Sequence, residues 1–134
     1  MVFLNAIEGA SVESFSKRVG RQGEDIASQV IQGRCKMKIV EKNFRARMGE
    51  IDIIARDHNT LVFIEVKSRV TLNAGFPEES VTENKQKKIR NVALYYLISH
   101  GYNPYDVNFR FDVISITFLD GFSHPSIKYF KNAF

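Results

Sequence analysis

The stretch GEIDIIARDHNTLVFIEVKSR, which runs from Gly49 to Arg69, decides the fold of this chain. Two apolar runs flank a polar segment, 56–60, whose Asn and Asp residues tolerate the backbone of a tight turn. The pattern predicts two antiparallel strands, Gly49–Ala55 and Leu61–Arg69, joined as a hairpin. Asp52 interrupts the first strand and the second ends in alternating charges, which a purely structural hairpin does not need.

The register of this hairpin brings the charges together. If the loop is centred on His58 and Asn59, Asp52 faces Glu65, and facing residues have Cβ atoms about 5 Å apart on one face of the sheet. By the same register Glu50 faces Lys67, while a loop of another length would shift every pair. Because side chains alternate along a strand, one face would carry Glu50, Asp52, Glu65, Lys67 and Arg69.

Two carboxylates at this spacing repel one another unless a positive charge offsets them. A hard divalent cation such as Mg²⁺ would do so, because it takes oxygen ligands at about 2.1 Å, usually from one or two carboxylates with water and phosphate oxygens. The alternative is a solvated end of the sheet whose charges pair across strands. From the spacing alone, both interpretations of Asp52 and Glu65 stand equally.

The rest of the chain predicts an α/β fold. The expected elements are a helix over Ser14–Gln32, a strand over Lys36–Phe44, the hairpin, a loop over Thr71–Glu79, a helix over Val81–His100 and a strand over Val107–Phe118. Gly20 and Gly23 weaken the start of the first helix, which we expect to be firm only from about Gly23. The order α-β-β-β-α-β predicts a mixed central sheet flanked by helices.

Length and composition indicate one domain over 14–134 after an irregular segment, 1–13, and leave the structure of the tail from His124 undecided. With 19 Lys and Arg against 15 acidic residues, the formal charge of +4 is compatible with a nucleic-acid partner without requiring one. The single Cys35 forms no internal disulfide, and no apolar run approaches the ~20 residues of a membrane helix. We therefore expect a cytoplasmic protein without a membrane partner.

Several motifs carry a resemblance to a known family. Asp52 followed by Glu65-Val66-Lys67 resembles the D…(D/E)xK signature of the restriction-endonuclease-like nuclease superfamily, although Ile51 replaces the proline that often precedes the aspartate. More of the chain resembles the YraN-type family of small bacterial proteins. The matching segments are GRQGED (20–25), NFRARMGEIDIIARD (43–57), FIEVKSR (63–69), GFPEESVTENKQKKI (75–89) and the final NAF (132–134).

The resemblance implies a restriction-endonuclease-like core and a metal-dependent site. The family is similar to archaeal Holliday-junction resolvases, in which a glutamate of the first helix joins the metal site, and Glu24 occupies the matching place. Asp52, Glu65, Lys67 and Glu24 would be catalytic. Asp52, Glu65, the carbonyl of Val66 and Glu24 would hold Mg²⁺ or Mn²⁺. In the alternative, Glu24 is an ordinary acid near a helix start, favoured by the helix dipole.

The basic residues near this site have two interpretations each. Lys67 would orient the attacking water and stabilise charge in the transition state, or it would pair with Glu50. Lys85 lies on the apolar stripe of its helix, so it needs an anionic partner or an exit to solvent, and phosphate or a site carboxylate would serve. The predicted contacts to nucleic acid are Lys85, Arg69, Arg45, Arg47 and Lys88.

The sequence therefore predicts a Mg²⁺- or Mn²⁺-dependent endonuclease acting on DNA, with branched or junction DNA among the candidate substrates. Junction cleavage would require a symmetric homodimer that presents two sites. The alternative is a non-catalytic nucleic-acid-binding or interaction module on a nuclease scaffold. A third interpretation, a structural dimer partner, rests on the apolar tail alone.

Overall fold

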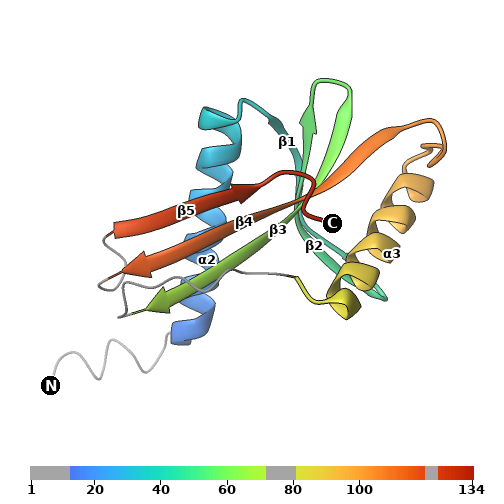
Figure 1. Cartoon of the computed structure of the whole chain (residues 1–134). Coiled ribbons are helices and arrows are strands. Elements are labelled where there is room, and N and C mark those ends of the chain that lie inside the picture. Colours follow the sequence, from blue (N-terminus) through green and yellow to red (C-terminus); the bar gives the residue numbers. More distant parts are fainter. Residues whose placement is uncertain (1–12, 72–80, 120–123) are drawn as a thin grey trace, which may run out of the picture.

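The computed structural model describes residues 13–71, 81–119 and 124–134, which form a mixed sheet covered by helices (Figure 1). The predicted loop over Thr71–Glu79 and nearly all of the segment 1–13 lie outside these residues. The elements are α2 (Phe15–Gln29), the π-helical turn η1 (Val30–Arg34), β1 (Lys38–Ala46), β2 (Gly49–Asp57), β3 (Thr60–Thr71), α3 (Glu83–Ser99), β4 (Asn108–Leu119) and β5 (His124–Phe130).

Within the described residues, the sheet has five strands in the order β1-β2-β3-β4-β5. β3 and β4 run parallel, and every other neighbouring pair is antiparallel. A parallel pair needs a crossover connection, and α3 provides it. The predicted order α-β-β-β-α-β is confirmed and is consistent with a restriction-endonuclease-like core. The tail, which the sequence left undecided, adds β5 at the edge of the sheet.

Helices bury both faces of β3. Leu61 and Phe63 belong to a core that contains Val92 and Tyr96 of α3, whereas Val62 and Ile64 belong to a second core with residues of α2. Because side chains alternate along a strand, a central strand covered on both faces is apolar almost throughout. Figure 1 shows α2 passing behind β3, β4 and β5, while α3 lies at the other end of the sheet near β1 and β2.

The first helix begins where the sequence predicts and is continuous from its start. Ser14 caps α2 by accepting a hydrogen bond from the backbone N–H of Lys17 at 3.3 Å. The expectation that the helix is firm only from about Gly23 is wrong, because α2 is continuous from Phe15 and buries Gly23 against β3. A Cβ atom added at Gly23 would lie 1.7 Å from the Ser68 hydroxyl oxygen. The glycine therefore allows α2 to approach β3 closely.

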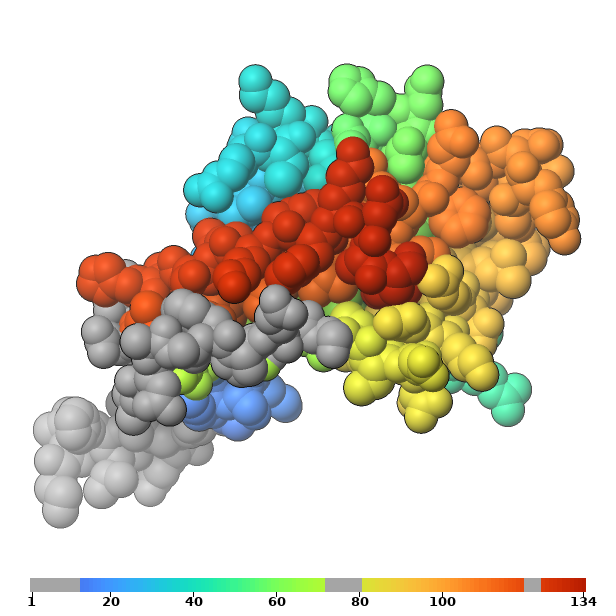
Figure 2. All heavy atoms as spheres, viewed as in Figure 1, coloured from blue at the N-terminus to red at the C-terminus, as the bar shows by residue number. Residues whose placement is uncertain are grey.

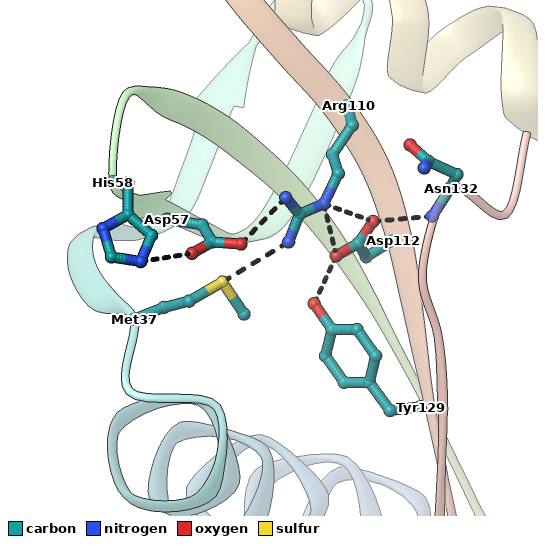
Figure 3. Close-up of polar contacts among 7 residues, drawn as sticks. All are labelled: Met37, Asp57, His58, Arg110, Asp112, Tyr129 and Asn132. Carbon is teal, nitrogen blue, oxygen red and sulfur yellow. Dashed lines mark hydrogen bonds and ion pairs between the residues drawn. The ribbon is translucent and has the colours of Figure 1, made fainter.

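A buried polar cluster fixes β5 and the residues that follow it (Figure 3). Asp112 is fully buried and accepts hydrogen bonds from Arg110 Nε at 3.1 Å, from the Asn132 backbone N–H at 2.9 Å and from the Tyr129 hydroxyl. Arg110 Nη1 also lies 2.9 Å from Asp57 Oδ2, at the turn between β2 and β3. A buried carboxylate is tolerated when its oxygens are paired in this way.

The end of the chain packs beside the start of α3. Figure 2 shows the last residues, in dark red, against the yellow residues around 81–90. The Ala133 N–H donates to the Phe111 carbonyl at 2.8 Å, and the ring of Phe134 stacks on that of Phe111 with centroids 5.1 Å apart. The guanidinium of Arg90 lies 5.4 Å from the centre of the Phe134 ring. The tail therefore closes one edge of the α3 core.

We expect Gly23→Ala to lower the free energy of unfolding by about 1–3 kcal/mol, because the new methyl group overpacks the contact with Ser68. The additional change Ser68→Gly should recover much of this loss. Urea unfolding measures both variants. Gly20→Ala is the matched control in the same helix, since nothing lies within 4 Å of a Cβ atom there. Equal effects of Gly20→Ala and Gly23→Ala would contradict the packing role.

Candidate functional site

The site lies where β2 and β3 separate. Their ladder follows the predicted register as far as Ile53 and Ile64, the last paired positions. Beyond this pair the backbone N–H of Val66 donates to the Asp52 side chain, at 2.8 Å from Oδ2. In Figure 1, β2 leads back from this point toward the start of α3, whereas β3 continues beside β4. The Asp52 carboxylate therefore sits in a fork between two diverging strands.

A pocket of about 370 Å³ occupies this fork. It is bounded by both strands, by the first half of α2 and by the first turn of α3. The lining residues are Ser16, Gly20, Glu24, Glu50, Asp52, Glu65, Val66, Lys67, Ser68 and Lys85. All four predicted catalytic residues, the Val66 backbone and Lys85 thus come together in one pocket.

One predicted pair is wrong. Glu50 does not face Lys67, because β2 and β3 separate before the register reaches them. Glu50 is instead paired with Arg45 of β1, and its Oε2 lies 3.2 Å from Arg45 Nε. Both Glu50 and Lys67 still line the pocket, where they belong to opposite arms of the fork.

Glu65 is the buried anchor of the site. Its side chain is 8% exposed, and its Oε1 lies 2.7 Å from Nζ of Lys85, whose side chain is 45% exposed. Lys85 lies on the face of α3 that carries the buried Ile89 and Val92, as the helical spacing predicts. Its anionic partner in this structure is the site carboxylate, one of the two partners that the sequence left open.

Burial and mutual repulsion perturb the acids of the pocket. Burial, followed by the negative charge of Glu65, raises the pKa of Asp52 from 3.8 to about 7, although the Val66 hydrogen bond opposes the shift. Burial and then Glu50 raise the pKa of Glu24. Burial alone would lower the pKa of Lys85, but the hydrogen bond and charge of Glu65 outweigh it and raise that pKa. The pocket therefore favours any additional positive charge.

The donor set suits a hard divalent cation. The N–H and C=O of one strand residue point to the same side, so the Val66 carbonyl points into the fork as its N–H does. Asp52, Glu65 and this carbonyl supply oxygen donors, and Mg²⁺ needs only one or two carboxylates besides water and phosphate. Among the described residues, no three Asp, Glu, His or Cys side chains form a ready ligand cluster. Glu24 as a metal ligand stays a prediction.

The predicted nucleic-acid contacts are spread around this pocket. Arg45 and Arg47 line a neighbouring hollow of about 290 Å³, which shares Glu50 with the main pocket. Lys88 is exposed on α3, and its Cβ approaches the start of β2 at Gly49. Arg69 lies farther along β3, half-buried and outside the residues that line the pocket.

Three further residues close the pocket where α2 meets β3, and the sequence does not mark them as part of a site. Ser16 and Gly20 line it, and so does Ser68. The Ser68 hydroxyl is buried without a hydrogen-bond partner within the part of the chain that the structure describes. No periodicity or motif marks these residues, because their position depends on how closely α2 approaches β3 at Gly23.

We expect Asp52→Asn to stabilise the protein in EDTA. The folded pKa of Asp52 is raised, so its contribution to stability is complete below about pH 3.8 and is lost as pH rises through about 7. Asparagine retains an oxygen for the Val66 N–H but carries no charge. Its advantage should approach about 4 kcal/mol near pH 8 and vanish toward pH 4, as measured by urea unfolding. Wild type and variant with parallel pH profiles would contradict this account, and Asp25→Asn, at an exposed position of α2, is the control.

Comparisons with known proteins place the chain among bacterial relatives. A model described as "Uncharacterised protein family UPF0102" matches residues 23–116. A UPF0102 protein of Geobacter sulfurreducens is 46% identical over 119 residues, which cover 89% of this chain and 90% of the relative. A UPF0102 protein of Clostridium botulinum is 46% identical over 120 residues, covering 89% of this chain and 95% of the relative.

A UPF0102 protein of Geotalea uraniireducens is similar to the same degree, with 45% identity over 119 residues that cover 89% of this chain and 91% of the relative. In the described residues, no helix combines the length and apolar character needed to cross a membrane. The predicted membership of an uncharacterised bacterial family is confirmed. The chain belongs to the UPF0102 family.

Proposed function

We propose that this protein is a metal-dependent nuclease that hydrolyses phosphodiester bonds in DNA. The observation that carries the proposal is the placement of Asp52 and Glu65 in one pocket, at the point where β2 and β3 separate, with Lys67 following on the same strand. Two carboxylates and a carbonyl can hold a divalent cation, and a lysine beside them can stabilise negative charge on a phosphate.

Asp52, Glu65 and the Val66 carbonyl would hold Mg²⁺ or Mn²⁺. When bound, the ion supplies a Lewis acid that neutralises charge on the scissile phosphate. Hydrolysis forms one bond from water to phosphorus and breaks one P–O bond, so a proton must leave the water. Glu24 is suited to accept it because burial raises the pKa of its carboxyl group. Lys67 would orient the water and stabilise negative charge on the phosphate oxygens.

Basic residues beside the pocket would position the nucleic acid. Arg45, Arg47 and Lys88 flank it on the side of β1 and α3, and Arg69 lies farther along β3. Phosphate contacts of this type give affinity that falls with salt and carries little sequence information. The preference for DNA over RNA, and for branched over linear DNA, follows from the family resemblance alone. Cleavage of a four-way junction would also require two copies of the chain.

A second candidate function is a non-catalytic nucleic-acid-binding module. The observation that favours it is the ion pair between Lys85 and Glu65, which already neutralises one of the two carboxylates without a metal. Such a module would bind DNA in EDTA, and its affinity would depend on the basic residues rather than on Asp52.

The test is incubation of purified protein with labelled linear, single-stranded and four-way DNA in Mg²⁺ or Mn²⁺. Wild type should cut at least one substrate, and Asp52→Ala, Glu65→Gln and Lys67→Met should each lower the rate by about 100-fold or more. Glu24→Gln should slow the reaction more than Asp25→Asn, its exposed neighbour on the same helix.

Two results would remove the nuclease assignment. One is the absence of cleavage by wild type with either ion, and the other is undiminished cleavage by the Asp52→Ala variant. DNA binding in EDTA that survives Glu65→Ala, combined with no cleavage in metal, would establish the binding module instead.

A further inference from the structure

Lys85 occupies one of the two Glu65 oxygens that could bind a metal ion. Its Nζ lies 2.7 Å from Oε1, so the ammonium contacts one of the two carboxylate oxygens directly. A divalent cation on that oxygen would lie close to the ammonium, and two positive charges at such separation repel strongly in a partly buried pocket. Lys85 and a metal ion therefore compete for the Glu65 carboxylate in this geometry.

The two partners differ in their freedom to move. Glu65 lies on β3 in the middle of the sheet, and its side chain is almost fully buried. Lys85 lies in the first turn of α3 with nearly half of its side chain exposed. Lysine has a long flexible stem, so its ammonium can change partner while the helix stays in place. We therefore expect the Lys85 side chain, and not that of Glu65, to move when a metal ion binds.

The released ammonium would remain at the edge of the pocket. Lys85 is one of the lining residues, and it lies near the amino end of α3, which the helix dipole makes more favourable for anions. The ion would now neutralise Glu65 and Asp52, so neither would hold the lysine. A phosphate group of the substrate is then the anion within its reach.

We propose that Lys85 is the counter-ion of Glu65 in the metal-free protein, and that an incoming divalent cation displaces its ammonium, which then binds a phosphate of the substrate. This inference rests on the metal site of the proposed function. The exchange makes metal binding and phosphate binding favour one another. The metal frees Lys85 to bind phosphate, and phosphate keeps Lys85 from competing with the metal for Glu65. Lys85 thereby acts on the substrate only after the metal has entered.

Calorimetric titration with Mn²⁺ tests the competition without any catalytic readout. Lys85→Met should bind Mn²⁺ more tightly than wild type, on the order of tenfold, because the competing charge is gone. Lys85→Arg retains the charge and should bind no tighter than wild type. Lys87→Met removes the same charge from an exposed position of α3 and should change the affinity much less.

Thermal unfolding gives a second readout that requires only folded protein. In EDTA, Lys85→Met leaves Glu65 buried without its counter-ion and should melt below wild type. Saturating Mn²⁺ should raise its melting midpoint by more than it raises that of wild type, because tighter binding to the folded state stabilises it more.

Inorganic phosphate tests the second half of the exchange. Wild type should bind phosphate more tightly with Mg²⁺ than with EDTA. This increase in phosphate affinity should be largely lost in Lys85→Met and retained in Lys87→Met. An equal gain in all three proteins would overturn the transfer of Lys85 to phosphate.

Mn²⁺ titration separates the competition between Lys85 and the metal from the existence of the metal site itself. If Glu65→Gln abolishes Mn²⁺ binding while Lys85→Met binds the ion no tighter than wild type, the metal site stands and the competition is wrong. If wild type binds no Mn²⁺, or Glu65→Gln binds it equally well, the metal site itself fails and the nuclease assignment fails with it.

Discussion

The hydrogen bond from the Val66 N–H to the Asp52 carboxylate is the contact on which the architecture of the site depends. This hydrogen bond takes the place of the next backbone hydrogen bond of the β2–β3 ladder. The strands can therefore separate while the Val66 N–H still has an acceptor. One arm of the fork carries β1 and β2 toward α3, and the other continues beside β4. The pocket exists because this separation leaves room between the arms for side chains from both helices.

The sheet holds two buried acidic positions that are treated in opposite ways. Asp112 receives hydrogen bonds from Arg110, Tyr129 and the Asn132 backbone, so its charge is fully paired within the fold. Asp52 and Glu65 share a pocket with Glu24 and Glu50, and Lys85 pairs with Glu65. A protein that needs only stability pairs its buried charges as at Asp112. The shortage of positive charge at the fork is a cost that a ligand would offset.

Local patterns predicted the hairpin and the charged residues that it brings to the site, for identifiable reasons, whereas Glu24 was predicted from the family resemblance. The period of two in β3 and the polar turn fix the register up to Ile53 and Ile64. Asp52 and Glu65 lie one position beyond this ladder, and they meet in the pocket rather than as a paired position of the sheet. The predicted pair of Glu50 and Lys67 failed because it assumed that the ladder continues. No local sequence pattern predicts the fork, because it depends on the Asp52 side chain taking the place of a backbone acceptor for the Val66 N–H.

Other features depended on contacts between distant segments. The helical spacing showed that Lys85 needs an anion, but the choice of Glu65 depends on how α3 packs against the sheet. The closure of the pocket on the side of α2 depends on Gly23 lying against Ser68, far away in the sequence. The sequence of β5 has no clear periodicity of its own. The residues that follow β5 are held by Asp112 of the neighbouring strand β4.

The topology also has a consequence for the order in which the site assembles during folding. Asp52 and Glu65 belong to one hairpin, whose contacts are local and close at low entropic cost. Lys85 joins them only when α3 completes the crossover between the parallel strands β3 and β4, a contact that spans a longer segment. We therefore expect the two carboxylates to meet before their counter-ion arrives, so that their repulsion opposes the closure of the hairpin during folding. Refolding that accelerates as pH falls, or on addition of a divalent cation, is the kinetic signature of this order of assembly.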